Sequence, residues 1–259
     1  MSSKNKTYNL FIIDKSSSML GVRDVTISGM NEQLEAIRNS QKEFDDQDQI
    51  VSLVLFSNNV DLTEIWNKPI DEVENFTRET YAPSGMTALH EAIGRGVSKL
   101  KNDITQEIAD RTANVIVNIF TDGQENASSH EWQGDPTKNL IEEVKETGLW
   151  TVAFIGCGDE ASVFNVARSL GIHQGDTMSY SAGTVGTQTA FSAMATSRGM
   201  RAKCYSKAIS DGLDTKAVNL GCNFFQNMDI SDPIVDGDVS DEVKENIQTD
   251  GTDSAVDIL

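Results

Sequence analysis

Short runs of apolar, mostly β-branched residues alternate along the chain with longer stretches in which apolar residues recur every three or four positions. The first pattern is typical of buried strands and the second of amphipathic helices. Their alternation predicts a doubly wound α/β fold, with helices on both faces of a mostly parallel sheet. Six strands are expected, including one antiparallel edge strand, at residues 8–13, 50–56, 60–66, 115–120, 151–155 and 177–180.

Helical spacing of apolar residues places the covering helices between these strands. Glycines stand near the ends of two of them, at Gly148 and Gly171, as is common where helices end. Helices are predicted around residues 30–37, 89–100, 140–145 and 161–170, with another beginning near residue 188.

The length of the chain favours one core. With 259 residues, 38% of them hydrophobic, it is long enough for one α/β domain with an appendage and short for two. We expect the domain over residues 1–200 and a C-terminal extension over 201–227, with a helix packed on the domain as one option. Residues 228–259 contain ten Asp or Glu against one Lys. This composition predicts a flexible acidic tail, because it buries too little apolar surface to offset the entropy of ordering.

Charge and cysteine content exclude several classes of function. The formal net charge of -19 argues against nucleic-acid binding, because that affinity comes largely from Lys and Arg contacts to phosphates. There is no run of about 18 apolar residues, so no membrane span is predicted. The first residues are polar, unlike a signal peptide, and Cys157, Cys204 and Cys222 are too scattered for a disulfide framework. These features favour a cytoplasmic protein.

Oxygen-bearing side chains stand at the end of the first expected strand. Asp14-Lys15-Ser16-Ser17-Ser18 directly follows that strand, and its Asp-x-Ser-x-Ser spacing allows three side chains to turn inward along one loop. Taken alone, such a motif is more often a strand-to-helix turn with a capping side chain.

Two further segments add a hydroxyl and a carboxylate. In Ser84-Gly85-Met86-Thr87 the glycine permits a sharp turn just before a helix, and Thr121-Asp122-Gly123 follows the apolar strand at 115–120. Parallel sheets gather their ligand-binding loops at the carboxyl ends of the strands, and hard cations prefer oxygen ligands. The candidate cation-binding side chains are therefore those of Asp14, Ser16, Ser18, Thr87 and Asp122.

In type, order and spacing these residues resemble the metal-ion-dependent adhesion site of the von Willebrand factor A domain family, whose fold is Rossmann-like. The resemblance covers roughly residues 7–200. It implies that Ser16, Ser18 and Thr87 coordinate the cation directly, while Asp14 and Asp122 act mainly through bound water. Every ligating position of the pattern is present. The departure is the residue before Thr87, which is Met86 where many members have glycine.

The resemblance implies a protein-protein interaction module and no catalysis. Neutral hydroxyls close to the cation leave its charge partly uncompensated, so that a carboxylate from outside is strongly attracted. We therefore expect Mg²⁺, or Mn²⁺ or Ca²⁺, as the cofactor and a protein partner that supplies an Asp or Glu, with the oligomeric state left open. The resemblance also suggests the intracellular branch of the family, members of which occur in bacteria and phages.

Two other classes of function remain open. A metal-dependent hydrolase or phosphoryl-transfer enzyme would fit Asp14 after a strand, but an aspartyl-phosphate phosphatase needs a second acid where Ser16 stands. A structural or assembly protein would use the same site for self-association, which the sequence does not separate from binding of another partner.

The charged segments also have more than one interpretation. The acidic tail is a solubility device, an interaction tail for a basic partner, or an internal ligand of the metal site; the last is our hypothesis, because tethering raises the effective concentration. A basic cluster is interpreted as a solvated helix face, with binding of a phosphate or of the acidic tail as the alternative. Its members are Arg198, Arg201, Lys203 and Lys207.

Overall fold

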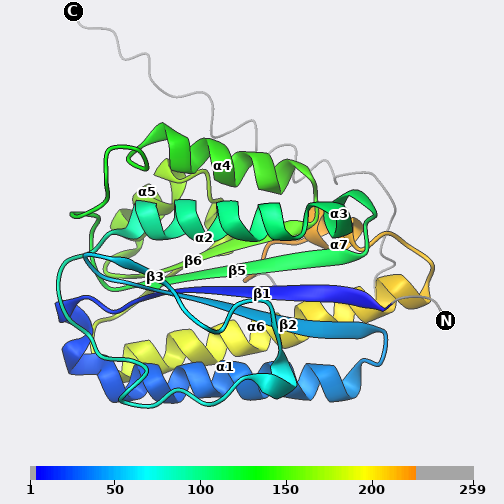
Figure 1. The fold of residues 1–259 in the computed structure, drawn as a ribbon, viewed down its shortest axis with the longest axis horizontal. Coiled ribbons are helices and arrows are strands. Elements are labelled where there is room, and N and C mark those ends of the chain that lie inside the picture. Colours follow the sequence, from blue (N-terminus) through cyan, green and yellow to red (C-terminus); the bar gives the residue numbers. More distant parts are fainter. Residues whose placement is uncertain (1–3, 226–259) are drawn as a thin grey trace, which may run out of the picture.

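A computed structural model, which describes residues 4–225, has a central sheet with helices on both faces (Figure 1). The strand order is β3-β2-β1-β5-β6-β7, and β4 also pairs with β2. The strands are β1 (Asn5–Asp14), β2 (Gln47–Phe56), β3 (Val60–Leu62), β4 (Lys68–Pro69), β5 (Ala113–Thr121), β6 (Trp150–Cys157) and β7 (Thr177–Tyr180).

The predicted fold class is confirmed, with one more strand than expected. All six predicted strands are present, and the seventh, β4, has two residues, too few to carry a periodic pattern. β1, β2, β5, β6 and β7 run parallel, whereas β3 and β4 are both antiparallel to β2. The carboxyl ends of the five parallel strands therefore share one edge of the sheet.

The helices form two layers, one on each face of the sheet (Figure 1). One layer contains α2 (Leu89–Asp103), α4 (Asp135–Glu146), α5 (Glu160–Ser169) and the short α3 (Thr105–Ala109). The other contains α1 (Arg23–Glu43) and α6 (Thr184–Ser210), with α7 (Lys216–Gly221) packed beside α6. Three short 3-10 helices complete the described elements: η1 (Ser17–Val22), η2 (Ile70–Glu72) and η3 (Gln174–Asp176).

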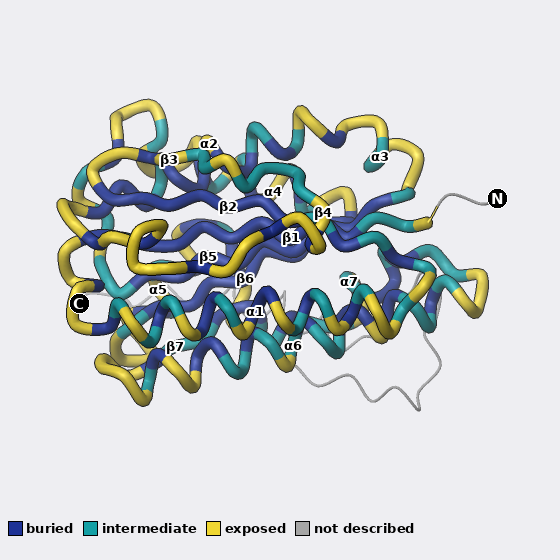
Figure 2. Tube along the Cα trace, turned by 60° about the horizontal axis from the view of Figure 1, so that its bottom comes forward, coloured by how far each residue is buried: buried dark blue, intermediate teal, exposed yellow. Residues whose placement is uncertain are grey.

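Alternating side chains of the strands divide the core in two. Leu10 and Ile12 of β1 lie in the cluster under α2 and α4, whereas Phe11 and Ile13 lie in the cluster under α1 and α6. This is the two-residue period of a strand covered on both faces. The parallel strands are accordingly buried along almost their whole length (Figure 2).

The face under α6 also contains a buried guanidinium. Arg198, only 2% exposed, donates hydrogen bonds to Asn9 Oδ1 on β1 and Asn118 Oδ1 on β5. Its guanidinium carbon lies 4.7 Å from the centre of the Phe11 ring. Burial lowers the pKa of Arg198 to about 9, because removal from water disfavours the charged form.

The interpretation of the basic cluster as a solvated face is wrong for both arginines. Arg201 is 4% exposed and donates to the carbonyl oxygens of Val218 and Cys222, each at 3.0 Å. The physical reason is that the asparagines of the sheet offer side-chain amide oxygens, while α7 and the residue after it offer peptide carbonyl oxygens. Both kinds of oxygen accept hydrogen bonds from guanidinium groups. Arginine spacing along one helix does not report what lies opposite that helix.

α6 continues through residue 200, the expected limit of the domain, and ends at Ser210. Residues 228–259 lie outside the described residues, so the acidic tail expected from the sequence stays a prediction. Within residues 4–225, every helix is too short or too polar to cross a bilayer.

Candidate metal-binding site

Asp14 is held at the last position of β1, the middle strand between β2 and β5. Its side chain is fully buried, and its oxygens accept hydrogen bonds from Ser16 N at 2.7 Å and Thr121 Oγ1 at 2.6 Å. The backbone is fixed as well, because the Tyr81 hydroxyl donates to the carbonyl oxygen of Asp14 at 2.6 Å. The carboxylate is therefore oriented before any ligand arrives.

The two serines of the first motif connect β1 to the end of β5. Ser16 Oγ lies 2.9 Å from Ser18 Oγ, and Ser18 Oγ donates to Asp122 Oδ1 at 2.6 Å. The pairing of Ile13 with Phe120 in the sheet explains this proximity, since it places the residues that follow the two strands side by side. The structure thus brings together Asp14, Ser16, Ser18 and Asp122.

Thr87 joins this group from the loop before α2. Its side chain is buried, and a Cβ added at Gly123 would lie 3.0 Å from Thr87 Oγ1 and 3.7 Å from Asp14 Oδ2. Asn126 supports the loop, since its side chain accepts from Thr87 N at 2.8 Å while its own N–H donates to Thr87 O at 3.0 Å. All five side chains predicted from the sequence therefore gather at one edge of the sheet.

The departure at Met86 leaves this geometry intact. The Met86 side chain is 50% exposed, and its N–H donates to Asn58 Oδ1 at 2.6 Å. Gly85 has φ +84°, and an added Cβ would overlap Asn58 Oδ1, so a larger residue is excluded there on both counts. Gly85 also exchanges two hydrogen bonds with Ser17, at 3.0 and 2.9 Å.

Sequence reasoning missed Tyr81 and Glu125. Glu125 accepts from the N–H groups of His90, Ala127 and Ser128 and from the Ser128 hydroxyl, at 2.6 to 2.9 Å. It thereby joins the loop after β5 to the start of α2. Nothing in the spacing of either residue indicates this role, because both act through backbone groups that only the folded chain brings near.

Burial sets the electrostatics of the site. It raises the pKa of Asp14, against the opposing effect of hydrogen bonds from Thr121 and Ser16. Burial also raises the pKa of Asp122, opposed by the hydrogen bond from Ser18. A bound cation would favour both ionised carboxylates, since an opposite charge at short range offsets their desolvation.

The available atoms fit a hard divalent cation. The cluster offers hydroxyl and carboxylate oxygens, the ligands that Mg²⁺, Mn²⁺ and Ca²⁺ prefer. In residues 4–225 no group of three or more His, Cys, Asp and Glu is placed to hold a metal.

Comparison with known proteins agrees with the fold. The family described as von Willebrand factor type A domain matches residues 10–124, a stretch that contains all five residues of the cluster. The match supports a von Willebrand factor type A domain in this chain. No curated protein sequence matches it.

Solved structures share the fold of this chain at low sequence identity. The pilus adhesin SpaC from Lactobacillus rhamnosus GG, in an open conformation, is 12% identical over 77% of this chain and 30% of that one, with a TM-score of 0.55. The PilB minor pilin from Streptococcus sanguinis is 14% identical over 77% of this chain and 62% of its own, with a TM-score of 0.51. The chain thus spans less than two thirds of either protein.

The vWF domain of the type V pili tip protein Mfa5 from Porphyromonas gingivalis is similar over nearly its whole length. It is 12% identical over 81% of this chain and 97% of that chain, with a TM-score of 0.50. At this identity the likeness shows the fold alone.

Proposed function

We propose that the chain is a non-catalytic interaction module that holds an Asp or Glu of a protein partner through a divalent cation. The observation that carries this proposal is the convergence of two carboxylates and three hydroxyls from three separate loops at the carboxyl edge of the sheet. The carboxylates belong to Asp14 and Asp122, and the hydroxyls belong to Ser16, Ser18 and Thr87.

Each residue has a distinct part in the proposed site. Ser16, Ser18 and Thr87 would contact the cation, while Asp14 and Asp122 would hold it through water. The bound cation supplies the positive charge that attracts a carboxylate from outside. The side chains around it fix its position and leave coordination sites open, because neutral hydroxyls do not neutralise it. A local positive charge allows a chain of net charge -19 to bind an acidic partner.

The placement of Asp14 argues against the hydrolase or phosphoryl-transfer alternative. A nucleophilic carboxylate must reach the substrate, whereas Asp14 is fully buried and both of its oxygens accept hydrogen bonds. Asp14 is placed to orient the loop at Ser16. This placement supports a role in binding in preference to covalent catalysis.

The first experiment is a calorimetric titration of Mg²⁺, Mn²⁺ and Ca²⁺ into metal-free protein. We expect saturable one-site binding that is lost in Asp14→Ala and in Thr87→Val, which removes a hydroxyl at nearly constant shape. Thr189→Val is the matched control, because that hydroxyl is exposed on α6 and donates to Val185 O. Equal binding in all four proteins, or none in the wild type, would contradict the proposed site.

The second experiment tests the partner chemistry. A short peptide with one central Asp is titrated into the metal-loaded protein and into protein with a chelator, beside the same peptide carrying Asn. We expect binding that requires both the carboxylate and the cation. Size measurement with and without metal separates self-association, the third class of function, from binding of a different partner.

A further inference from the structure

Exposed apolar side chains gather around the proposed metal-binding site. In the part of the chain that the structure describes, four large hydrophobic side chains are exposed, namely Leu20 at 58%, Met86 at 50%, Val185 at 78% and Leu220 at 45%. The first three lie on segments at the carboxyl edge of the sheet, the edge that carries the site. A single exposed apolar residue is common on any protein, whereas a group of them marks a surface that binds something.

Leu20 and Met86 flank the site on two neighbouring loops. Leu20 comes two residues after Ser18 in η1, so their Cα atoms lie within about 7 Å of each other. Met86 directly precedes Thr87, at about 4 Å between Cα atoms. The two loops are joined by the pair of hydrogen bonds described above. Both side chains therefore stand beside the hydroxyls proposed to contact the cation.

Val185 extends this apolar surface on the side of Leu20. It is the second residue of α6, and the first residue, Thr184, lines a cavity of about 400 Å³ together with Leu20. The start of α6 therefore lies beside η1. We call Leu20, Met86 and Val185 the apolar rim of the site.

The basic side chains next to the apolar rim already have partners within the chain. Lys15 Nζ lies 3.6 Å from Asp61 Oδ2, and two nitrogens of Arg78 donate to the two oxygens of Asp24. Arg23 donates to two backbone carbonyl oxygens. A second acid on a partner would compete with these contacts, whereas an apolar side chain would meet open apolar surface. The surroundings of the site therefore favour an apolar neighbour of the bound carboxylate.

We propose that the partner presents its metal-held Asp or Glu directly beside a bulky apolar residue, which packs on the apolar rim. This inference rests on the proposed function, because the cation fixes the carboxylate from which the rim is reached. Successive residues of a peptide have Cα atoms about 4 to 7 Å apart over one or two positions, the same range that separates Leu20 and Met86 from the site residues. The cation then recognises the charge, and the rim selects its neighbour by removing apolar area from water.

The test compares four peptides by calorimetry on the full chain loaded with Mg²⁺. The central residue and its two neighbours are Leu-Asp-Leu, Ser-Asp-Ser, Glu-Asp-Glu or Leu-Asn-Leu. We expect the first to bind roughly tenfold more tightly than the second, the size expected for covering one apolar side chain. Glu-Asp-Glu should bind no more tightly than Ser-Asp-Ser. Leu-Asn-Leu should show no binding that depends on Mg²⁺.

Two variants separate the apolar rim from general stickiness of the surface. The Leu20→Gln/Met86→Gln protein should lose the tenfold preference for Leu-Asp-Leu and keep its affinity for Mg²⁺. Leu220→Gln is the matched control, because it removes an exposed apolar side chain at the other edge of the sheet. Leu220 lies on α7, where a Cβ added at Gly148, just before β6, would be 3.6 Å from its Cδ1 (Figure 1). This control should keep the preference.

The outcomes distinguish this inference from the proposed function. Equal binding of Leu-Asp-Leu and Ser-Asp-Ser to a wild type that binds Mg²⁺ would overturn the inference alone. Tighter binding of Glu-Asp-Glu would mean a second acidic contact, and loss of Mg²⁺ binding in the double variant would mean that the rim supports the site itself. A dimer that the double variant abolishes without a change in peptide binding would assign the rim to a second copy. Each of these results would also overturn the inference. A wild type that binds no cation would overturn the proposed function, and the inference with it.

Discussion

Replacing Arg198 with methionine tests what holds α6 on the sheet. The guanidinium is buried, donates to one asparagine on β1 and one on β5, and stacks over Phe11. Methionine keeps an unbranched stem against the Phe11 ring while it removes the charge and both hydrogen bonds. The substitution therefore separates polar pairing from packing.

The magnitude follows from these contacts. Hydrogen bonds to charged groups contribute about 1.5–3 kcal/mol each, so two of them amount to roughly 3–6 kcal/mol. Burial opposes the charge, as the lowered pKa of Arg198 indicates, and methionine relieves that part of the cost. We expect the free energy of unfolding to fall by about 2–4 kcal/mol.

Urea unfolding followed by circular dichroism measures this loss, with an unchanged m-value as the check that the two end states are the same. Adding Asn118→Leu to the Arg198→Met protein should recover part of the stability. Asn118 Nδ2 has no hydrogen-bond partner among the described residues, and its oxygen would lose Arg198. A single variant within about 0.5 kcal/mol of the wild type would refute the reasoning, as would a further loss in the double variant.

Three other substitutions probe the frame of the site. Gly29→Ala should lower the free energy of unfolding by about 1–3 kcal/mol in a urea titration, because the added Cβ would overlap the Phe191 ring. Tyr81→Phe removes the hydrogen bond to Asp14 O and should cost about 1 kcal/mol, with weaker Mg²⁺ binding by calorimetry. Glu125→Gln should cost about 1–2 kcal/mol at pH 7. Burial opposes ionisation of Glu125, but hydrogen bonds outweigh it and lower its pKa from 4.5. The stabilisation is therefore present above about pH 4.5 and is lost as the pH falls through the folded-state pKa, where the two proteins should converge.

The strands and the five site residues could be predicted because both leave local signals. A strand buried on both faces is a continuous apolar run, as at residues 115–120, and the residue after it stands at the carboxyl edge whatever the details of packing. This rule, together with the resemblance of the motifs to a family pattern, predicts that Asp14 and Asp122 belong to one site. The order of the strands, with β1 in the middle, brings them together.

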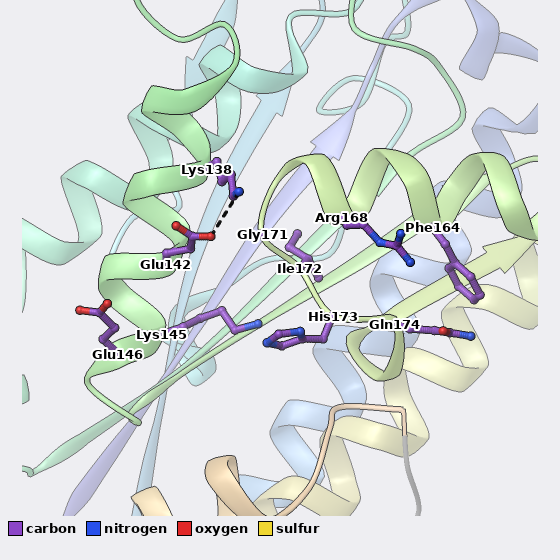
Figure 3. Close-up of a pocket in the computed structure, with 10 residues that line it drawn as sticks. All are labelled: Lys138, Glu142, Lys145, Glu146, Phe164, Arg168, Gly171, Ile172, His173 and Gln174. Atoms are coloured by element: carbon purple, nitrogen blue, oxygen red, sulfur yellow. Dashed lines mark ion pairs between the residues drawn. The ribbon is translucent and has the colours of Figure 1, made fainter. Parts of the chain in front are cut away.

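What the sequence did not predict depends on contacts between distant segments. Arg198 and Arg201 have the spacing of a solvated helix face. Asn9 and Asn118 nevertheless accept from Arg198, and the carbonyl oxygens of Val218 in α7 and of Cys222 directly after it accept from Arg201. A cavity lined by Lys145 and Arg168 is likewise formed by segments far apart in the sequence, namely α4, the end of α5 and the turn before η3 (Figure 3). A single sequence does not encode such pairings in any local pattern.

The hydrogen bonds between the loops of the proposed metal-binding site would have a consequence for discrimination by ionic size. Ser17 and Gly85 tie the first loop to the second, and Thr87 and Asn126 tie the second to the third. Loops joined by these hydrogen bonds resist moving apart, so the space between their oxygen atoms resists widening. Mg²⁺ needs oxygens at about 2.0–2.1 Å and Ca²⁺ at about 2.3–2.6 Å with more of them, so a frame that resists expansion favours the smaller ion.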